Sequence, residues 1–183
     1  MFAIEDSLLI VIDCQEKMMP AIYNHENLLE RIELLIRGCR ILDIPILTAQ
    51  QYTKGLGDTS QILKDALGDF KHIEKIAFSC IGEDEFAKEL NRSGKYDDRK
   101  NIIVCGVEAH VCVQQTVLDL LAVGNNVYVI ADCIGSRKEN DRIYAENRMR
   151  QSGAVLTTAE SVLFELLKGA DHPKRKEISA LVK

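Results

Sequence analysis

The sequence lacks long apolar runs and a basic N-terminus. No run reaches the roughly 20 apolar residues that a membrane-spanning helix needs, and the opening Met-Phe-Ala-Ile-Glu-Asp is acidic where a signal peptide is basic. Positive charge is not in excess either, because 23 basic side chains face 28 acidic ones. We therefore expect a small-molecule partner, no nucleic-acid or membrane partner, and a cytoplasmic location.

Cysteine pairs and histidine clusters are also missing. The six cysteines form no C-x-x-C pair, and most lie in or beside apolar runs, which indicates reduced thiols and argues against a disulfide framework. The four histidines are spread over the whole chain without the spacing of metal ligands. No glycine-rich phosphate loop follows the first apolar run. We predict no metal and no cofactor.

What the sequence does contain is an alternation of short apolar runs and helical patterns. The runs cover 7–12, 45–50, 70–76, 101–105, 126–131 and 154–157. The first helical pattern spans 27–42, with Asn27 as the expected cap and Glu30 completing a capping box. Six strands alternating with helices predict a three-layer α/β/α, doubly wound, Rossmann-like fold with a six-stranded, mostly parallel sheet.

The length favours one domain over residues 1–183. Nearly half of the 183 residues are apolar, which is enough for one sizeable core and too little for two ordinary domains. We expect the core to cover about 5–168 and a C-terminal tail to cover 169–183.

Polar side chains lie at or near the carboxyl ends of several predicted strands. They are Asp13, Gln50, Lys75, Cys112 and Asp132. In parallel sheets, functional groups gather beyond the carboxyl ends of the strands. We therefore expect a site at this edge, although Asp132 could equally cap a helix.

Cys112 is the strongest candidate for a reactive group among these side chains. It lies where a predicted strand passes through Gly106 into a predicted helix. A helix N-terminus or a nearby cation stabilises the reactive thiolate, and N–H groups in this turn can stabilise an oxyanion. In the alternative interpretation, Cys112 is a small buried hydrophobe between Val111 and Val113.

Three segments together resemble the isochorismatase-like cysteine hydrolases, in the branch of isochorismatase-domain-containing proteins. They are Leu9-Ile10-Val11-Ile12-Asp13-Cys14-Gln15, Lys75-Ile76-Ala77-Phe78-Ser79-Cys80 and Gly106-Val107-Glu108-Ala109-His110-Val111-Cys112-Val113. They occur in the order of that family, and the similarity covers about residues 5–168. The resemblance implies the isochorismatase-like fold and a homo-oligomer.

The resemblance also implies a catalytic triad of Asp13, Lys75 and Cys112. The Cys112 thiolate would attack a carbonyl carbon, and water would hydrolyse the resulting thioester. Lys75 would depress the pKa of the thiol, while Asp13 would take its proton and later protonate the leaving group. By the same resemblance, a cis peptide joins Val107 to Glu108, and the N–H groups of Glu108 and Cys112 form the oxyanion hole.

Two activities of related proteins are disfavoured. Nicotinamidases of this family carry an Asp-x-His metal motif, but the corresponding segment 49–57 has no histidine. The vinyl-ether hydrolases of this superfamily lack the cysteine nucleophile. Metal-independent hydrolysis of a small amide or related carbonyl compound remains.

Specificity would come from loops around Gln51, Tyr52, Phe78 and 134–137, with His110 as a further pocket residue. His110 could instead pack or form local hydrogen bonds. Two other functions stay open. One is a non-catalytic small-molecule or protein-binding module on the same fold, and the other is a thiol sensor that uses several of the cysteines.

Overall fold

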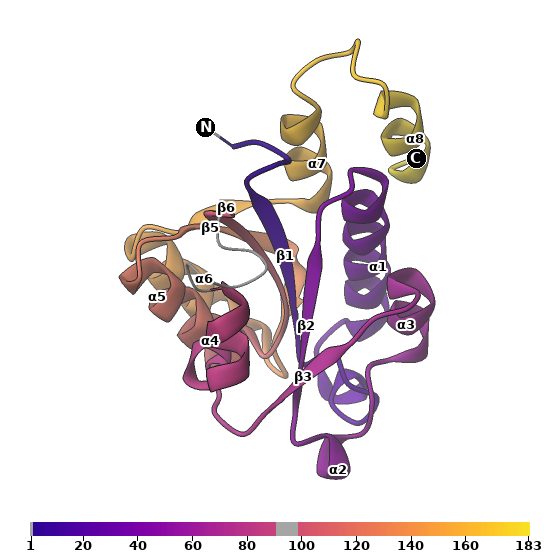
Figure 1. The fold of residues 1–183 in the computed structure, drawn as a ribbon. Coiled ribbons are helices and arrows are strands. Elements are labelled where there is room, and N and C mark those ends of the chain that lie inside the picture. Colours follow the sequence, from indigo (N-terminus) through magenta and orange to yellow (C-terminus); the bar gives the residue numbers. More distant parts are fainter. Residues whose placement is uncertain (1, 91–98) are drawn as a thin grey trace.

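A computed structural model describes residues 2–90 and 99–183, in which six strands form one sheet (Figure 1). The strand order is β3-β2-β1-β4-β5-β6, and every neighbouring pair is parallel. The strands are β1 (Ser7–Ile12), β2 (Ile46–Gln51), β3 (His72–Lys75), β4 (Asn101–Val107), β5 (Asn126–Gly135) and β6 (Val155–Thr157). The predicted α/β fold is confirmed, with a sheet that is parallel throughout.

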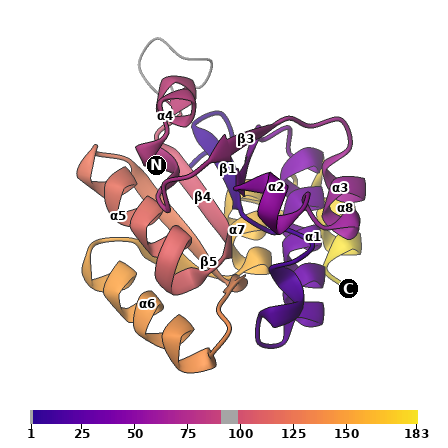
Figure 2. The ribbon, with the colours of Figure 1, turned by 90° about the horizontal axis from the view of Figure 1, so that it is seen from below.

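Helices cover both faces of this sheet. They are α1 (His25–Ile41), α2 (Thr53–Leu56), α3 (Gln61–Leu67), α4 (Asp84–Leu90), α5 (Gln114–Ala122), α6 (Glu139–Gln151), α7 (Ala159–Leu167) and α8 (Arg175–Leu181). Figures 1 and 2 show α4, α5 and α6 on one face and α1, α3, α7 and α8 on the other. The sheet therefore separates two apolar cores.

The central strand β1 shows why its sequence is a continuous apolar run. Its six residues are all buried. Successive side chains of a strand point to opposite faces, so Leu9 and Val11 pack in the core beneath α1 while Ile10 and Ile12 pack in the core beneath α5. Both faces thus select apolar residues.

Two boundaries differ from the predictions. Helix α1 begins at His25, and its N-cap residue, Asn24, has a left-handed φ of 52° and makes no side-chain capping bond, so the predicted capping box at Asn27 is wrong. The segment 169–183 contains α8, whose Ile178 is buried in the core beside α1, so the core continues past residue 168.

Gly106 lets β4 pass very close to β1 shortly before the turn that carries Cys112. It pairs with Ile12 in the sheet and has a φ of +122°. A Cβ atom at this position would lie 2.1 Å from the carbonyl oxygen of Ile12. Gly106 and Ile12 lie in neighbouring central strands of a closely packed core. Neither backbone can shift to make room for the Cβ atom without a cost in free energy.

We expect Gly106→Ala to lower the free energy of unfolding by about 3 kcal/mol or more, through overpacking and backbone strain. Urea denaturation followed by circular dichroism measures this loss. Gly124→Ala is the matched control, because Gly124 has a φ of +89° but no atom within 4 Å of the added Cβ. The control should lose only about 1 kcal/mol, and an equal loss in both variants would contradict the close-approach argument.

Candidate active site

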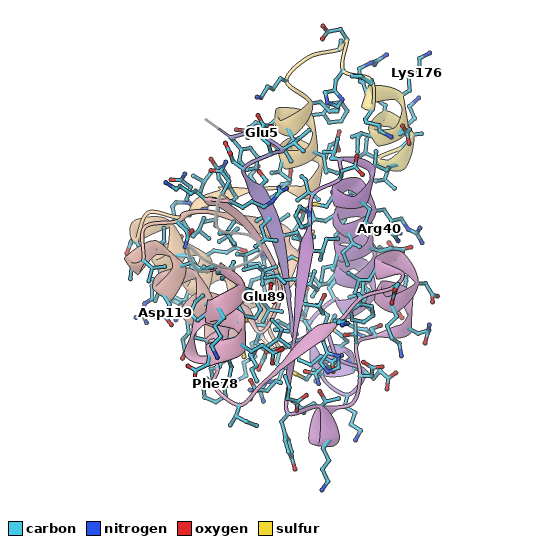
Figure 3. All side chains as sticks on the ribbon, viewed as in Figure 1. Glu5, Arg40, Phe78, Glu89, Asp119 and Lys176 are labelled. Atoms are coloured by element: carbon cyan, nitrogen blue, oxygen red, sulfur yellow. The ribbon has the colours of Figure 1, made fainter. Side chains whose placement is uncertain are left out.

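The three residues of the expected triad come from three different strands at the carboxyl edge of the sheet. Asp13 directly follows β1, Lys75 ends β3, and Cys112 lies in η3 (Ala109–Val113), a π-helical turn between β4 and α5. Figure 2 looks onto this end of the molecule. In Figure 3, Phe78 lies at this end and Glu5 lies near the opposite one.

Asp13 and Lys75 form a buried ion pair. The Lys75 Nζ lies 2.6 Å from the Asp13 Oδ2, and the side chains are 1% and 0% exposed, respectively. Asp13 itself has a left-handed φ of 52°, which turns the chain sharply after β1. No donor among the described residues completes a well-directed hydrogen bond to Asp13 Oδ1. That oxygen therefore keeps lone pairs available to accept a proton.

Backbone and amide oxygens hold the Lys75 ammonium in place. It donates to Gln51 Oε1 at 2.5 Å, to Phe78 O at 3.2 Å and to Ala77 O at 3.3 Å. Gln51 lies opposite Lys75 in the β2–β3 register, and its Nε2 donates to Ile76 O at 2.8 Å, which turns its Oε1 toward the ammonium. Gln51 was expected to line the substrate pocket. Both ends of its side-chain amide instead form hydrogen bonds with Lys75 and Ile76.

Burial and mutual attraction set the charge states of this pair. Burial raises the pKa of Asp13 above its ordinary value, although the Lys75 charge opposes the increase. Burial alone would lower the pKa of Lys75, but the negative charge of Asp13 outweighs it and the pKa of Lys75 is raised. Lys75 is therefore a permanent cation, and Asp13 is a stronger base than an exposed carboxylate.

The thiol of Cys112 lies close enough to Asp13 and Lys75 for both charges to shift its pKa. Burial and the negative charge of Asp13 raise the pKa of Cys112 to about 12, against the opposing effect of Lys75. Lys75 lowers the pKa of this thiol, as expected, but burial and the Asp13 charge outweigh its effect. Cys112 therefore stays protonated at neutral pH, and thiolate forms only when the proton leaves.

This charge state predicts a steep pH dependence for alkylation of Cys112. Because only the thiolate reacts, the rate with iodoacetamide should rise about tenfold per pH unit between pH 7 and pH 10, below the pKa. Cys112 is 4% exposed, more than any of the other five cysteines. Peptide mapping by mass spectrometry gives the rate at each site. A rate at Cys112 that is already flat above pH 7 would contradict a raised pKa.

The turn that carries Cys112 is fixed on both sides. The peptide bond between Val107 and Glu108 is cis, as the resemblance implies. The Glu108 carboxylate accepts hydrogen bonds from the Arg137 backbone N at 3.0 Å and from its Nε at 3.1 Å. Val113 N donates to Glu108 O at 3.2 Å, which closes the π-helical turn. The loop after β5 therefore anchors the turn that carries Cys112.

The side chains of the other expected pocket residues, His110, Tyr52 and Phe78, form no hydrogen bond with the ion pair within the described residues. His110 Nδ1 lies 3.0 Å from Ser136 Oγ, and the ring lines a surface cavity with Asp141 and Tyr144 that neither Asp13, Lys75 nor Cys112 lines. Tyr52 and Phe78 are 49% and 54% exposed beside the lysine segment. These two remain candidates for the entrance of the site, whereas His110 serves the local contacts that were the alternative interpretation.

Asp132 and Gln50, which also follow predicted strands, support the fold. Asp132 Oδ2 pairs with Arg31 at 2.8 Å, and its Oδ1 accepts from the N–H of Ala159 at the start of α7. Gln50 Nε2 donates to Asp58 Oδ1 at 2.6 Å. Neither side chain joins the Asp13–Lys75 pair.

Sequence reasoning missed two polar residues near the site. Gln15 brackets Gln51, accepting its N–H at 2.8 Å and donating to its carbonyl at 3.1 Å. Thr116 Oγ1 donates a hydrogen bond to the carbonyl oxygen of Cys112 at 2.7 Å. Their positions, two residues after Asp13 and one helical turn after Cys112, are the only sequence signals that point to them.

No group of three or more His, Cys, Asp or Glu side chains between residues 2–90 and 99–183 is arranged to hold a metal ion. In the same part of the chain, every helix is too short or too polar to cross a bilayer.

Comparisons with known proteins agree with this fold. The isochorismatase domain family matches residues 7–161. Isochorismatase domain-containing protein 2 from Danio rerio is 39% identical over 176 residues, which is 96% of this chain and 86% of that protein.

Solved structures are similar over nearly the whole chain. One described as the MAR1 ribonuclease from Caenorhabditis elegans has a TM-score of 0.91 and 39% identity, covering 99% of this chain and 91% of that one. The YcaC gene product from Escherichia coli, described as an octameric hydrolase of unknown specificity, has a TM-score of 0.86 and 23% identity, covering 98% and 86%. The second of these shows the fold alone.

Proposed function

Because the chain belongs to the isochorismatase family, we propose that it is a hydrolase that uses Cys112 to cleave a small amide or related carbonyl compound. The observation that carries this proposal is the fully buried Asp13–Lys75 pair, 2.6 Å apart, beside the most exposed thiol of the chain. Burying two charges is costly, so such a pair at the carboxyl edge of a parallel sheet favours a functional role.

The proposed reaction begins with a proton transfer. Asp13 takes the proton of Cys112 as the thiolate attacks the substrate carbonyl carbon, and Lys75 offsets the negative charge that forms. The backbone N–H groups of Glu108 and Cys112 receive the oxyanion of the tetrahedral intermediate. Asp13 then protonates the departing amine, which leaves an acyl thioester on Cys112.

Water completes the cycle. Asp13, now ionised again, takes a proton from a water molecule that attacks the thioester carbonyl. The carboxylic acid leaves and the thiol of Cys112 is restored. Every proton in this scheme passes through the one carboxylate, and we propose that neither a metal nor a cofactor takes part.

Ribonuclease activity is a second candidate, because the 39% identical structure from Caenorhabditis elegans is described as a ribonuclease. Two features of this chain weigh against it. The formal net charge of -5 repels a phosphate backbone, and the proposed nucleophile is only 4% exposed, which suits a small substrate better than a polymer.

A substrate panel separates these candidates. The purified protein is incubated with small primary amides, with esters and with an RNA oligonucleotide, and acid-quenched samples are analysed by intact-protein mass spectrometry. Release of a carboxylic acid together with an acyl adduct on Cys112 supports the proposal. RNA cleavage that persists in Cys112→Ala, without any acyl adduct, would replace it. Saturable ligand binding without turnover would favour the binding module.

The remaining expectations about the whole protein stay predictions. They are one domain over residues 1–183, a homo-oligomer in solution and a cytoplasmic location. Light scattering and fractionation of cells that express the protein would test the last two.

A further inference from the structure

Thr116 connects two segments that meet at the site. Its side chain lies in α5 and is fully buried. The Thr116 Oγ1 accepts a hydrogen bond from the backbone N–H of Cys80 at 2.9 Å and donates one to the carbonyl oxygen of Cys112 at 2.7 Å. Since an N–H group only donates and a carbonyl only accepts, the hydroxyl hydrogen must point toward Cys112.

Hydrogen bonds within the segment from Lys75 to Glu83 fix its own conformation. The Lys75 ammonium holds the carbonyls of Ala77 and Phe78, and Glu83 Oε1 accepts the N–H groups of Ile76 and Ala77, both at 2.8 Å. These bonds shape the segment without fixing it relative to the turn 109–113, which carries Cys112.

Among residues 2–90 and 99–183, the Cys80–Thr116 contact is the hydrogen bond that joins the backbone of this segment to the turn and helix that carry Cys112, whereas the Lys75 side chain acts on the Cys112 thiol. The same hydroxyl also bonds the Cys112 carbonyl. One side chain thus links the backbone of the lysine segment to the backbone of the nucleophile.

We propose that Thr116 is a positioning residue that holds the Lys75 segment in register with Cys112. This inference rests on the proposed function, because it assigns Thr116 to the reaction in which Lys75 offsets the charge formed at Cys112. Thr116 touches neither substrate nor reacting atoms. Its effect is on geometry, and an error of about 1 Å in such a site can cost about 100-fold in rate.

Thr116→Val keeps the shape of the side chain and removes the hydroxyl, whereas Thr116→Ser keeps the hydroxyl. With an accepted amide, Thr116→Val should lower kcat about 10- to 100-fold with KM changed less than about twofold, and Thr116→Ser should recover to within about threefold of the wild type. Thr158→Val is the control, because Thr158 Oγ1 caps α7 by accepting from Ser161 N and takes no part in the site. The control should leave kcat unchanged.

A measurement without substrate separates this inference from the hydrolase proposal. Hydrogen exchange read by mass spectrometry should accelerate about tenfold or more in Thr116→Val, both at Cys80 and across 109–113, and not in Thr116→Ser or Thr158→Val. If the wild type hydrolyses nothing, the hydrolase proposal fails and exchange alone decides whether Thr116 couples the segments. Unchanged exchange at Cys80, or acceleration spread evenly over the chain, would overturn the positioning role.

Discussion

Replacing Cys112 with alanine is expected to abolish turnover, with a fall in kcat of at least about 10⁴-fold for any accepted amide. The thioester cannot form without the sulfur, and Asp13 alone cannot replace a nucleophile that attacks the carbonyl directly. Initial rates and the acyl adduct, followed by intact-protein mass spectrometry, measure this effect.

Cys39→Ala provides the control for loss of a buried thiol. Cys39 lies in α1, in the core on the far side of the sheet from Cys112, and is also fully buried. That variant should keep its kcat, with only a modest loss of stability from the small cavity. Turnover that survives in Cys112→Ala would show that another group acts as the nucleophile.

The second large effect concerns stability. Lys75→Met removes the cation and leaves the Asp13 carboxylate buried without a partner, so we expect the free energy of unfolding at pH 7 to fall by about 3–5 kcal/mol. Urea denaturation of the variant and the wild type measures this difference. Turnover should be lost as well, since no cation then offsets the charge at Cys112.

The pH dependence of Lys75→Met follows from Asp13. Burial already raises the pKa of Asp13 above 3.8, and removing Lys75 raises it further. The folded variant therefore binds this proton more tightly than the unfolded chain does. Its stability deficit should grow as the pH rises above the unfolded pKa of about 4 and shrink as the pH falls back toward it.

Asp13→Asn in the Lys75→Met background is the matched variant. The neutral amide has no charge to leave unpaired, so the double variant should regain a large part of the lost stability at pH 7. A deficit in Lys75→Met that is independent of pH and unaffected by Asp13→Asn would mean that lost packing, and not the unpaired carboxylate, causes the destabilisation.

The sheet was predictable because a strand that is buried on both faces needs apolar residues at successive positions. Central strands such as β1 and β4 appear as short apolar runs, whereas β3 at the edge of the sheet is exposed at alternate residues. The parallel arrangement follows from the helices between the strands. The carboxyl ends of parallel strands share one edge of the sheet, so Asp13, Lys75 and Cys112 could be predicted to lie at that edge. Their pairing was not readable from that pattern, since β3 lies two strands away from β1 and strand order leaves no local trace.

The pKa of Cys112, the orientation of the Gln51 amide and the start of α1 depend on distances and backbone conformations that the sequence does not give. The net pKa of Cys112 results from burial and from two opposite charges whose distances only the fold sets. The role of Gln51 depends on which way its amide points, and this follows from the carbonyl of Ile76. The start of α1 depends on the left-handed backbone of Asn24, a conformation that asparagine adopts in some places and avoids in others.

The protonated state of Cys112 also bears on how the protein withstands oxidants. Peroxides oxidise thiolates to sulfenic acid, and cysteines that sense them are acidic and accessible. A thiol with its pKa raised to about 12 and a 4% exposed side chain offers almost no thiolate at neutral pH. In the proposed mechanism, the thiolate of Cys112 forms only when a substrate occupies the site, and this argues against the thiol-sensor alternative.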